Sequence, residues 1–298
     1  MPFEPRVVVV TGATGFTGGF VVRAIARRYP GVRLRCLVRP SSDRAPLDAI
    51  GAACVVGDLR DETSLRKAFA GAETLINVAS LGQDWIDSLF ESIRHSAFRR
   101  GIFIGTTAML TTLPVQSRPQ RERAEALVRS SGLEWTVLRP TMIYGTPRDR
   151  NVSRLIRLVL RCPVIPVVAA RAWQQPVHVE DVADAVTAVL SAEQTIGRAY
   201  NLAGREPLTL LDLVRETIAA TGRTRIVVPL PVGPVRAAVR LYNAVARRPW
   251  LTVEQVGRLQ EDKHFDCSDA RNSFGFAPRS FRDGVRAEVQ LIQQERRA

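Results

Sequence analysis

The chain has 298 residues, of which 46% are hydrophobic and 24% are charged, the balance of an ordinary globular protein and not of a disordered or fibrous one. Its formal net charge is +13, and such a charge is compatible with a nucleic-acid partner or an anionic membrane surface. Only Lys67 and Lys263 are lysines, and the arginines are scattered through the chain without interleaved aromatic residues, so a nucleic-acid interface is not favoured.

Apolar stretches and ligand spacings argue against two further classes of protein. No stretch approaches the roughly 20 apolar residues of a membrane span, and residues 1–5 lack the pattern of a secretory signal. The four cysteines and three histidines show no zinc-ligand spacing. We therefore expect a cytoplasmic protein without a membrane span and without a metal site.

The predicted elements begin with a β-branched strand at 6–11, a glycine cluster, and a helix at 15–29. Strands and helices then alternate up to residue 139. This alternation predicts an α/β fold, a doubly wound parallel Rossmann sheet with right-handed crossovers and helices on both faces. The further strands are expected at 33–38, 53–56, 74–77, 102–105 and 135–139, and the helices at 64–69, 85–100 and 120–130.

After residue 145 the pattern becomes mainly helical, which predicts a smaller, mainly helical C-terminal substrate lobe. The dinucleotide-binding domain is expected to span 1–150, with 176–204 returning to it, and the substrate lobe to span 151–175 and 205–298. The expected elements of the substrate lobe are helices at 152–160, 208–220, 235–245, 253–259 and 281–294, a Pro-interrupted apolar segment at 162–167 and a Pro-rich link at 229–234. In the returning segment we expect an apolar stretch at 177–179 and a helix at 182–190.

Three glycines, Gly12, Gly15 and Gly18, stand between the first strand and the first helix. Such a turn lets the backbone approach a pyrophosphate closely, and the N–H groups of the helix N-terminus then face the anion. A plain tight turn is the alternative, but the position in a β-α-β unit favours a dinucleotide site. The expected contacts in this loop are Gly12, Thr14, Gly15, Phe16, Thr17 and Gly18.

The loop 11–18 resembles that of the short-chain dehydrogenase/reductase superfamily, in its extended and atypical, epimerase/dehydratase-like branches. Further segments resemble the family in the expected order, namely 57–59 (Gly-Asp-Leu), 77–80 (Asn-Val-Ala-Ser), 138–145 and 176–183. The resemblance covers about two-thirds of the chain. It implies cofactor contacts for Asp58, Leu59, Asn77, Val78, Ala79 and Pro140.

The residue after the second predicted strand bears on the choice of cofactor. NAD-preferring sites usually carry an acid there, whereas a basic residue accommodates the 2′-phosphate of NADP. This chain has Arg39, followed by Ser41 and Ser42. We therefore expect NADP(H) to be preferred, with NAD(H) as the alternative cofactor. The competing interpretation is that Arg39 is simply solvated.

The family's usual tyrosine, with a lysine four residues later, is absent, because none of the four tyrosines has a lysine at that spacing. Alignment on the resembling helix 124–133 puts Ser117 at the tyrosine position and Arg121 at the lysine position. Arg121 could bind the ribose but cannot relay a proton. Ser117 is also a candidate helix cap. Thr106 and Thr107 match the carbonyl-orienting position, or else bond to backbone at the strand end.

Other residues could replace the missing acid, and each has a structural alternative. Tyr144 lies in the segment beside the nicotinamide, or is a packed aromatic residue. Acids at the start of a helix usually complement its dipole, which is the alternative for Glu180 and Asp181. Further candidates are His178, Glu180, Asp181, Asp149 and Arg150.

Segments 249–256 and 274–281 are similar to the C-terminal lobe of the atypical subgroup that contains the NADPH-binding accessory subunit of mitochondrial complex I, a subgroup that tolerates loss of the dyad. Two hypotheses follow. The first is an NADP-dependent oxidoreductase or epimerase acting on a small carbonyl or alcohol compound, such as a nucleotide sugar or secondary metabolite. The second is a catalytically silent redox sensor or structural protein that holds NADP(H) and needs no substrate. Paired helices of this fold often form homodimers, and helices 85–100 and 120–130 would be the pair to test in this chain.

Overall fold

A computed structural model describes residues 5–113, 118–245 and 257–296 of the chain. The chain divides into two compact units. Unit 1 comprises Met1–Pro140, Val179–Leu202 and Asp266–Ala277, and unit 2 comprises Thr141–His178, Ala203–Phe265 and Pro278–Ala298. This division differs from the predicted one at two main places, since 141–150 lie in unit 2 and 266–277 lie in unit 1.

Unit 1 contains a seven-stranded parallel sheet in the order β11-β6-β5-β4-β1-β2-β3, which confirms the predicted doubly wound α/β fold. The strands are β1 (Val7–Thr11), β2 (Arg33–Val38), β3 (Ala53–Val56), β4 (Thr74–Asn77), β5 (Arg100–Ile104), β6 (Glu134–Pro140) and β11 (Arg198–Leu202). The helices are α1 (Gly18–Arg28), α2 (Ala45–Asp48), α3 (Glu62–Phe69), α4 (Ile86–Arg94), α5 (Arg118–Arg129), α7 (Val179–Leu190) and α11 (Ser268–Phe274), with 3₁₀ turns at Thr107–Leu110 and Glu193–Thr195.

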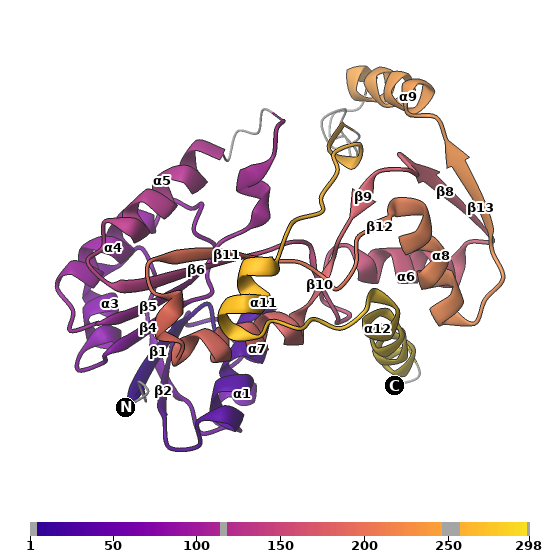
Figure 1. Ribbon diagram of the computed structural model, residues 1–298. Coiled ribbons are helices and arrows are strands. Elements are labelled where there is room, and N and C mark those ends of the chain that lie inside the picture. Colours follow the sequence, from indigo (N-terminus) through magenta and orange to yellow (C-terminus); the bar gives the residue numbers. More distant parts are fainter. Residues whose placement is uncertain (1–4, 114–117, 246–256, 297–298) are drawn as a thin grey trace. The chain divides into compact units, whose positions relative to one another are not determined.

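The sheet of unit 1 is covered on both faces, by α3, α4 and α5 on one side and by α1, α7 and α11 on the other (Figure 1). This is why β1 and β4 are buried along their whole length. The strand order reverses between β1 and β4, which are neighbours in the sheet. The loops that follow these two strands therefore diverge at the carboxyl edge, where open α/β sheets bind ligands.

In unit 1 one strand was not predicted, and one helix was predicted too long. The edge strand β11 was not predicted, because Arg198 and Asn201 interrupt its apolar pattern while Tyr200 and Leu202 are buried. The helix expected at 85–100 ends at Arg94. Arg100 instead begins β5, where its buried guanidinium donates to Thr136 Oγ1 and to the carbonyl oxygen of Val189, both at 2.8 Å.

Unit 2 contains helices α6 (Val152–Arg161), α8 (Leu210–Thr221), α9 (Val232–Val245) and α12 (Phe281–Glu295). Its sheets have two strands each, β7 (Ile143–Tyr144) with β10 (Val177–His178), β9 (Trp173–Gln174) with β12 (Leu208–Thr209), and β8 (Val164–Val168) with β13 (Ile226–Leu230). The link predicted at 229–234 was wrong, because β13 and α9 occupy that region. Of the helix predicted at 253–259, residues 257–259 are helical and the rest lies outside the described residues.

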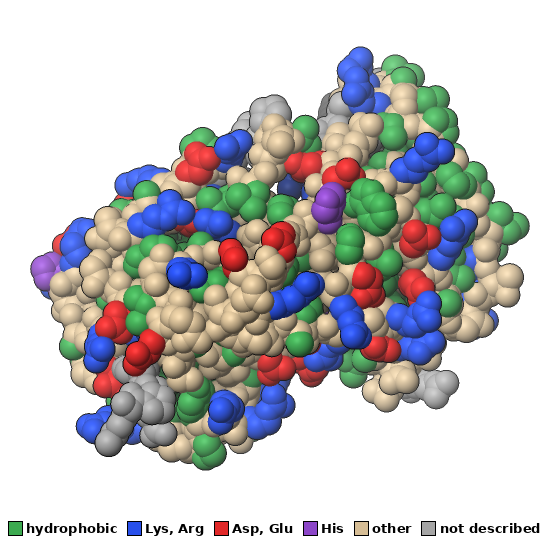
Figure 2. Space-filling model, in the orientation of Figure 1, with side chains coloured by type: hydrophobic (Ala, Val, Ile, Leu, Met, Phe, Trp, Pro, Cys, Tyr) green, Lys and Arg blue, Asp and Glu red, His purple; other side chains and the backbone are tan. Residues whose placement is uncertain are grey.

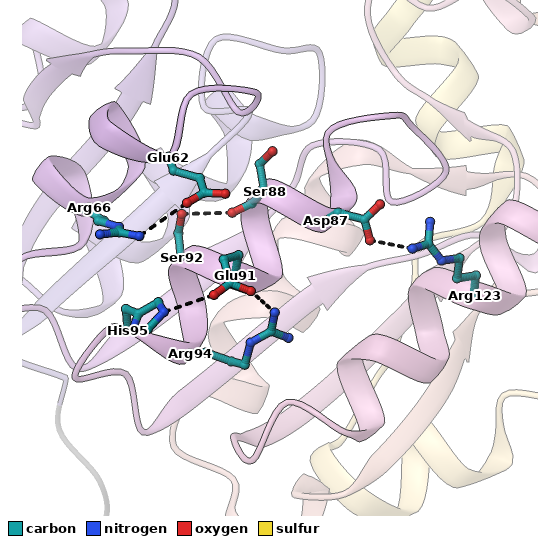
Figure 3. A network of polar contacts seen from close by, with 9 residues as sticks. All are labelled: Glu62, Arg66, Asp87, Ser88, Glu91, Ser92, Arg94, His95 and Arg123. Atoms are coloured by element: carbon teal, nitrogen blue, oxygen red, sulfur yellow. Dashed lines mark hydrogen bonds and ion pairs between the residues drawn. The ribbon is translucent and has the colours of Figure 1, made fainter.

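Exposed ion pairs occur on the helices of one face of the unit 1 sheet, and one of them connects α4 with α5 (Figure 3). Arg123 of α5 binds Asp87 of α4 at 2.7 Å, and Glu91 of α4 accepts from both Arg94 and His95. Exposed pairs of this kind contribute little to stability. They mark α4 and α5 as a charged surface, and the predicted dimer through these helices stays a prediction.

Candidate functional site

A cleft of about 260 Å³ lies in unit 1 at the carboxyl ends of β1, β2, β3 and β4. Each of these strands contributes residues from the loop that follows it. The cleft is therefore at the switch point of the sheet, where this topology binds nucleotides. Its lining residues are Gly12, Thr14, Gly15, Leu37, Arg39, Gly57, Asp58, Leu59, Arg60, Ala79, Ser80, Gln83 and Trp85.

The glycines of the first loop are required by close backbone approaches. Gly12 has a φ of 70°, and a Cβ atom there would lie 2.7 Å from the backbone nitrogen of Ala79. A Cβ atom on Gly18 would collide with the carbonyl oxygen of Gly12. The loop after β1 thus packs directly on the loop after β4 and on the first turn of α1, leaving room for a ligand against its backbone.

The N-terminus of α1 has the electrostatic character of an anion site. Its N-cap residue, Thr17, makes no side-chain cap hydrogen bond, and its first turn contains no acidic residue. The positive end of the helix dipole is therefore not neutralised by the helix itself. A dinucleotide pyrophosphate fits this position by charge and by the glycine cradle.

Hydrogen bonds hold the loops of the cleft in place. Thr11 Oγ1 donates to Asn77 Oδ1 at 2.6 Å, and Asn77 Nδ2 donates to the carbonyl oxygen of Ala79 at 2.8 Å. Both side chains are fully buried. Thr14 Oγ1 donates to Ser42 Oγ at 3.3 Å. The predicted role of Asn77 as a cofactor contact is untested, and the structure gives its side chain a loop-supporting position.

Two arginines line the cleft, and their electrostatic surroundings differ. Arg60 binds Asp84 through two hydrogen bonds of 3.1 and 3.0 Å, and Asp84 raises the pKa of Arg60. Among the described residues, Arg39 has no such partner and is exposed. Arg39 is thus the cleft cation whose charge is not already compensated by a carboxylate.

The structure brings together seven of the residues that sequence reasoning placed at the cofactor, all of them in the lining given above: Gly12, Thr14, Gly15, Arg39, Asp58, Leu59 and Ala79. The others lie outside this lining, namely Phe16, Thr17, Gly18, Ser41, Asn77, Val78, Arg121 and Pro140. Sequence reasoning missed Arg60, Gln83 and Trp85, which line the cleft. All three lie within five residues after the resembling segments 57–59 and 77–80, and this was the available signal.

The two threonines after β5 take backbone-bonding positions. Thr106 Oγ1 accepts from the backbone N–H of Ala108 at 3.2 Å and so caps a 3₁₀ turn. Thr107 is 5% exposed and its hydroxyl donates to the carbonyl oxygen of Pro140 at 3.3 Å. These contacts match the structural alternative for both residues, and a role in orienting a carbonyl is untested.

Arg121 lies on α5 beside the loop that follows β4. Its Cγ atom is 3.2 Å from the point where a Cβ atom on Gly82 would lie. Gly82 lies in the same loop as Ser80 and Gln83, which line the cleft. Arg121 is therefore placed in unit 1 next to the cleft loop, whereas Ser117 lies outside the described residues.

The other candidates for the missing acid have structural surroundings of their own. Tyr144 is 1% exposed and packs in the apolar core of unit 2, where its ring centroid is 5.2 Å from that of Phe281 and 5.3 Å from that of His178. Glu180 and Asp181 occupy the first turn of α7. The structure therefore favours the packing alternative for Tyr144 and the helix-dipole alternative for the two acids.

Asp149 is also buried in unit 2, at 6% exposure, and its carboxylate accepts from the backbone N–H groups of Asn151 and Ser153. Arg150 is exposed. Within the described ranges, no three or more His, Cys, Asp or Glu residues form a group that could hold a metal ion. In the same part of the chain, no helix combines the length and apolar character that a bilayer crossing requires.

Comparison with protein families gives two matches. Residues 12–193 match the family described as NAD(P)H-binding. Residues 114–294 match the domain described as RmlD substrate binding domain.

Several curated proteins are similar over most of their length. The chain is 27% identical over 272 residues to subunit 9 of the NADH dehydrogenase [ubiquinone] 1 alpha subcomplex of Mus musculus, a mitochondrial protein, covering 85% of this chain and 71% of that one. It is 28% identical over 277 residues to ceramide reductase of Caulobacter vibrioides, and the match covers 87% of this chain and 85% of the reductase. It is 25% identical to a ketoreductase of a farnesyl dihydroquinoline oxide from Stigmatella aurantiaca, covering 91% of each chain.

Solved structures share the fold of the whole chain. The protein in the crystal structure of gox2253 is 26% identical in sequence to this chain, and the two structures superpose with a TM-score of 0.80. The match covers 97% of this chain and 98% of that one.

Proposed function

The chain belongs to the NAD(P)H-binding family, within the atypical short-chain dehydrogenase/reductases, and from this premise we propose that it is an NADP(H)-dependent reductase of a carbonyl group on an apolar molecule. Binding of a nicotinamide dinucleotide is the family property. The preference for the phosphorylated cofactor and the class of substrate are our proposals.

Arg39 is the observation that carries the proposed cofactor preference. It follows β2, lines the cleft, and has no carboxylate partner among the described residues, while Asp84 already holds Arg60. A guanidinium binds phosphate oxygens in a two-pronged, charge-assisted manner. The hydroxyl of Ser42, which Thr14 holds against the glycine loop, is a second donor in the same segment.

The test is a titration of NADPH and NADH against the wild-type chain and Arg39→Ala. We expect the variant to bind NADPH about ten- to a hundredfold more weakly, because one charge-assisted contact is lost, and to bind NADH unchanged. Arg44→Ala is the matched control, since Arg44 follows β2 closely but does not line the cleft. An unchanged NADPH affinity in Arg39→Ala would refute the preference.

The names of two relatives support the class of substrate. One is a ceramide reductase, and the other a ketoreductase of a farnesylated compound. Both names denote reduction of molecules with long apolar parts. Epimerases of nucleotide sugars that share the fold are 16–17% identical, so they support the architecture without bearing on the substrate.

Bound NADPH would supply a hydride to the carbonyl carbon, and the oxygen would take up a proton. Arg121 is the fixed positive charge that we propose for the cofactor ribose or the developing oxyanion. A guanidinium stays protonated at neutral pH, so Arg121 would stabilise charge without transferring the proton. Water or a hydroxyl group must then supply the proton.

Turnover is tested by following the absorbance of NADPH while apolar ketones, among them an oxidised ceramide analogue, are offered. Consumption of NADPH is expected with apolar ketones and not with nucleotide sugars. Tight NADPH binding without consumption across the whole panel would contradict the reductase and favour a silent binding protein.

A further inference from the structure

Unit 2 carries a surface on which exposed apolar side chains and arginines occur together. Ile226 on β13 is 65% exposed, Leu241 on α9 is 71% exposed, and Val164 on β8 is 45% exposed. Scattered single residues of this kind are ordinary. Here they share one small sheet and the helix that follows it. We call this the β13–α9 surface, defined by Val164, Ile226, Val228, Arg236, Arg240 and Leu241.

The sheet part of this surface is apolar on both of its faces. Val164 and Ile226 are paired across β8 and β13. The alternate residues of β8, Ile165 and Val167, are 1% and 3% exposed and form the core with Val159 and Val214. A two-stranded sheet on a molecular surface usually turns polar residues outward. This one turns valine and isoleucine outward instead.

The helical part has the composition of an interfacial helix. Its exposed positions include Ala237, Leu241 and Ala244, at helical spacing, and Arg236 and Arg240 beside them. Residues 217–253 contain six arginines and no acidic residue. Figure 2 shows basic and apolar side chains side by side over α9. The arginine-rich chain thus contains one stretch whose sequence places no acidic residue among its arginines.

We propose that the β13–α9 surface docks unit 2 on an anionic lipid surface. Aliphatic side chains would enter the boundary between headgroups and acyl chains, and the arginines would bind lipid phosphates. The charge of the surface complements such a leaflet. Nucleic acid is the less suitable polyanion, because unpaired bases are bound by stacking on aromatic rings, whereas the exposed positions here are aliphatic. This inference goes beyond the proposed reductase and does not depend on its reaction.

The experiment is co-sedimentation of the full chain with vesicles. Vesicles of phosphatidylcholine and phosphatidylglycerol in a roughly two-to-one ratio are compared with pure phosphatidylcholine. We expect binding to the anionic vesicles only, weakening as ionic strength rises. The double variant Arg236→Gln/Arg240→Gln should bind about thirtyfold more weakly, since each basic residue near such a leaflet contributes roughly a fivefold factor. Leu241→Ser should weaken binding at low ionic strength as well.

The matched control is Arg66→Gln/Arg94→Gln, which removes the same charge from exposed helices of unit 1. It should bind vesicles like the wild type. Equal losses in the two double variants would show that total charge alone acts, and would overturn the proposal. The proposal would also be overturned if the wild type failed to sediment with anionic vesicles at low ionic strength. It would be overturned as well if single-stranded RNA displaced the chain from the vesicles and RNA binding depended on the same arginines. NADPH affinity, measured in parallel, verifies that each variant is folded.

Discussion

Arg139 of β6 and Glu125 of α5 form a two-pronged ion pair, with Nε–Oε1 and Nη2–Oε2 distances of 2.8 and 2.5 Å. Their side chains are 13% and 4% exposed. The pair ties α5 to the sheet one helical turn after Arg121. It therefore sets the position of that arginine relative to the loop after β4.

Replacement of Glu125 by glutamine tests this relationship. The guanidinium of Arg139 would remain buried with its charge uncompensated, so we expect the free energy of unfolding to fall by about 3 kcal/mol. Thermal denaturation measures the loss. Glu122→Gln, on the same helix but in an exposed pair with Arg118, should change stability by less than about 0.5 kcal/mol. Equal effects of the two variants would contradict a structural role specific to the buried pair.

Gly12→Ala tests the glycine cradle. The left-handed backbone and the approach to Ala79 leave no room for a methyl group, so the loop must shift. We expect NADPH affinity to fall at least tenfold and stability to fall by about 1–3 kcal/mol. Gly31→Ala is the control, because a Cβ atom at Gly31 meets no atom within 4 Å. Retained affinity in Gly12→Ala would show that the loop does not hold the pyrophosphate.

The central strands β1 and β4 were readable from the sequence because they are mostly apolar runs buried along their whole length. The predicted strands 33–38, 53–56 and 74–77 have the observed bounds. Burial on both faces removes the need for polar residues within the central strands, so their ends are marked sharply. The strands β11 and β13 lie at an edge and in a small sheet, where arginine and proline are tolerated, and their patterns therefore resembled loops.

The candidate site was predictable where one short segment supplies it, as in the glycine loop. Long-range pairs were not predictable. Arg60 and Asp84 meet in the folded chain through the loops after β3 and β4, and Glu125 meets Arg139 across a helix and a strand. In an arginine-rich sequence every acid has many candidate partners. Only the fold decides between them.

Arg121→Met tests the proposed fixed charge next to the cleft. Removal of an electrostatic stabiliser of a developing oxyanion should lower kcat by about a hundredfold, with a much smaller change in NADPH affinity. Arg121→Lys should recover part of the loss because it restores the charge. Arg123→Met is the control on the same helix, since Arg123 pairs with Asp87 on the surface. A wild-type kcat in Arg121→Met would remove Arg121 from the mechanism.

Glu288 of α12 predicts a pH dependence of stability in unit 2. Its side chain is fully buried, and its Oε2 accepts from the backbone N–H of Gly145 at 3.1 Å. Burial, followed by a hydrogen bond to Asp149 and the charge of Asp149, raises the pKa of Glu288 to about 10. At neutral pH the folded chain therefore holds Glu288 protonated, as a donor to Asp149.

The sign of the effect follows from proton release. An unfolded glutamate ionises near its ordinary pKa of 4.5, so unfolding between that pH and about 10 releases a proton. The contribution of Glu288 to stability is complete below pH 4.5 and is lost as the pH rises toward 10. Glu288→Gln keeps a donor for Asp149 and an acceptor for Gly145 but has no proton to release.

Thermal denaturation of the wild type and Glu288→Gln between pH 5 and pH 9, within the window set by the two pKa values, measures this contribution. The Tm of the variant minus that of the wild type should increase steadily with pH, by roughly 2–4 °C for each kcal/mol of linkage. Glu295→Gln, exposed at the end of the same helix, should give a curve parallel to the wild type. Parallel curves for Glu288→Gln as well would mean that Glu288 is ionised in the folded chain, with Arg157 compensating its charge.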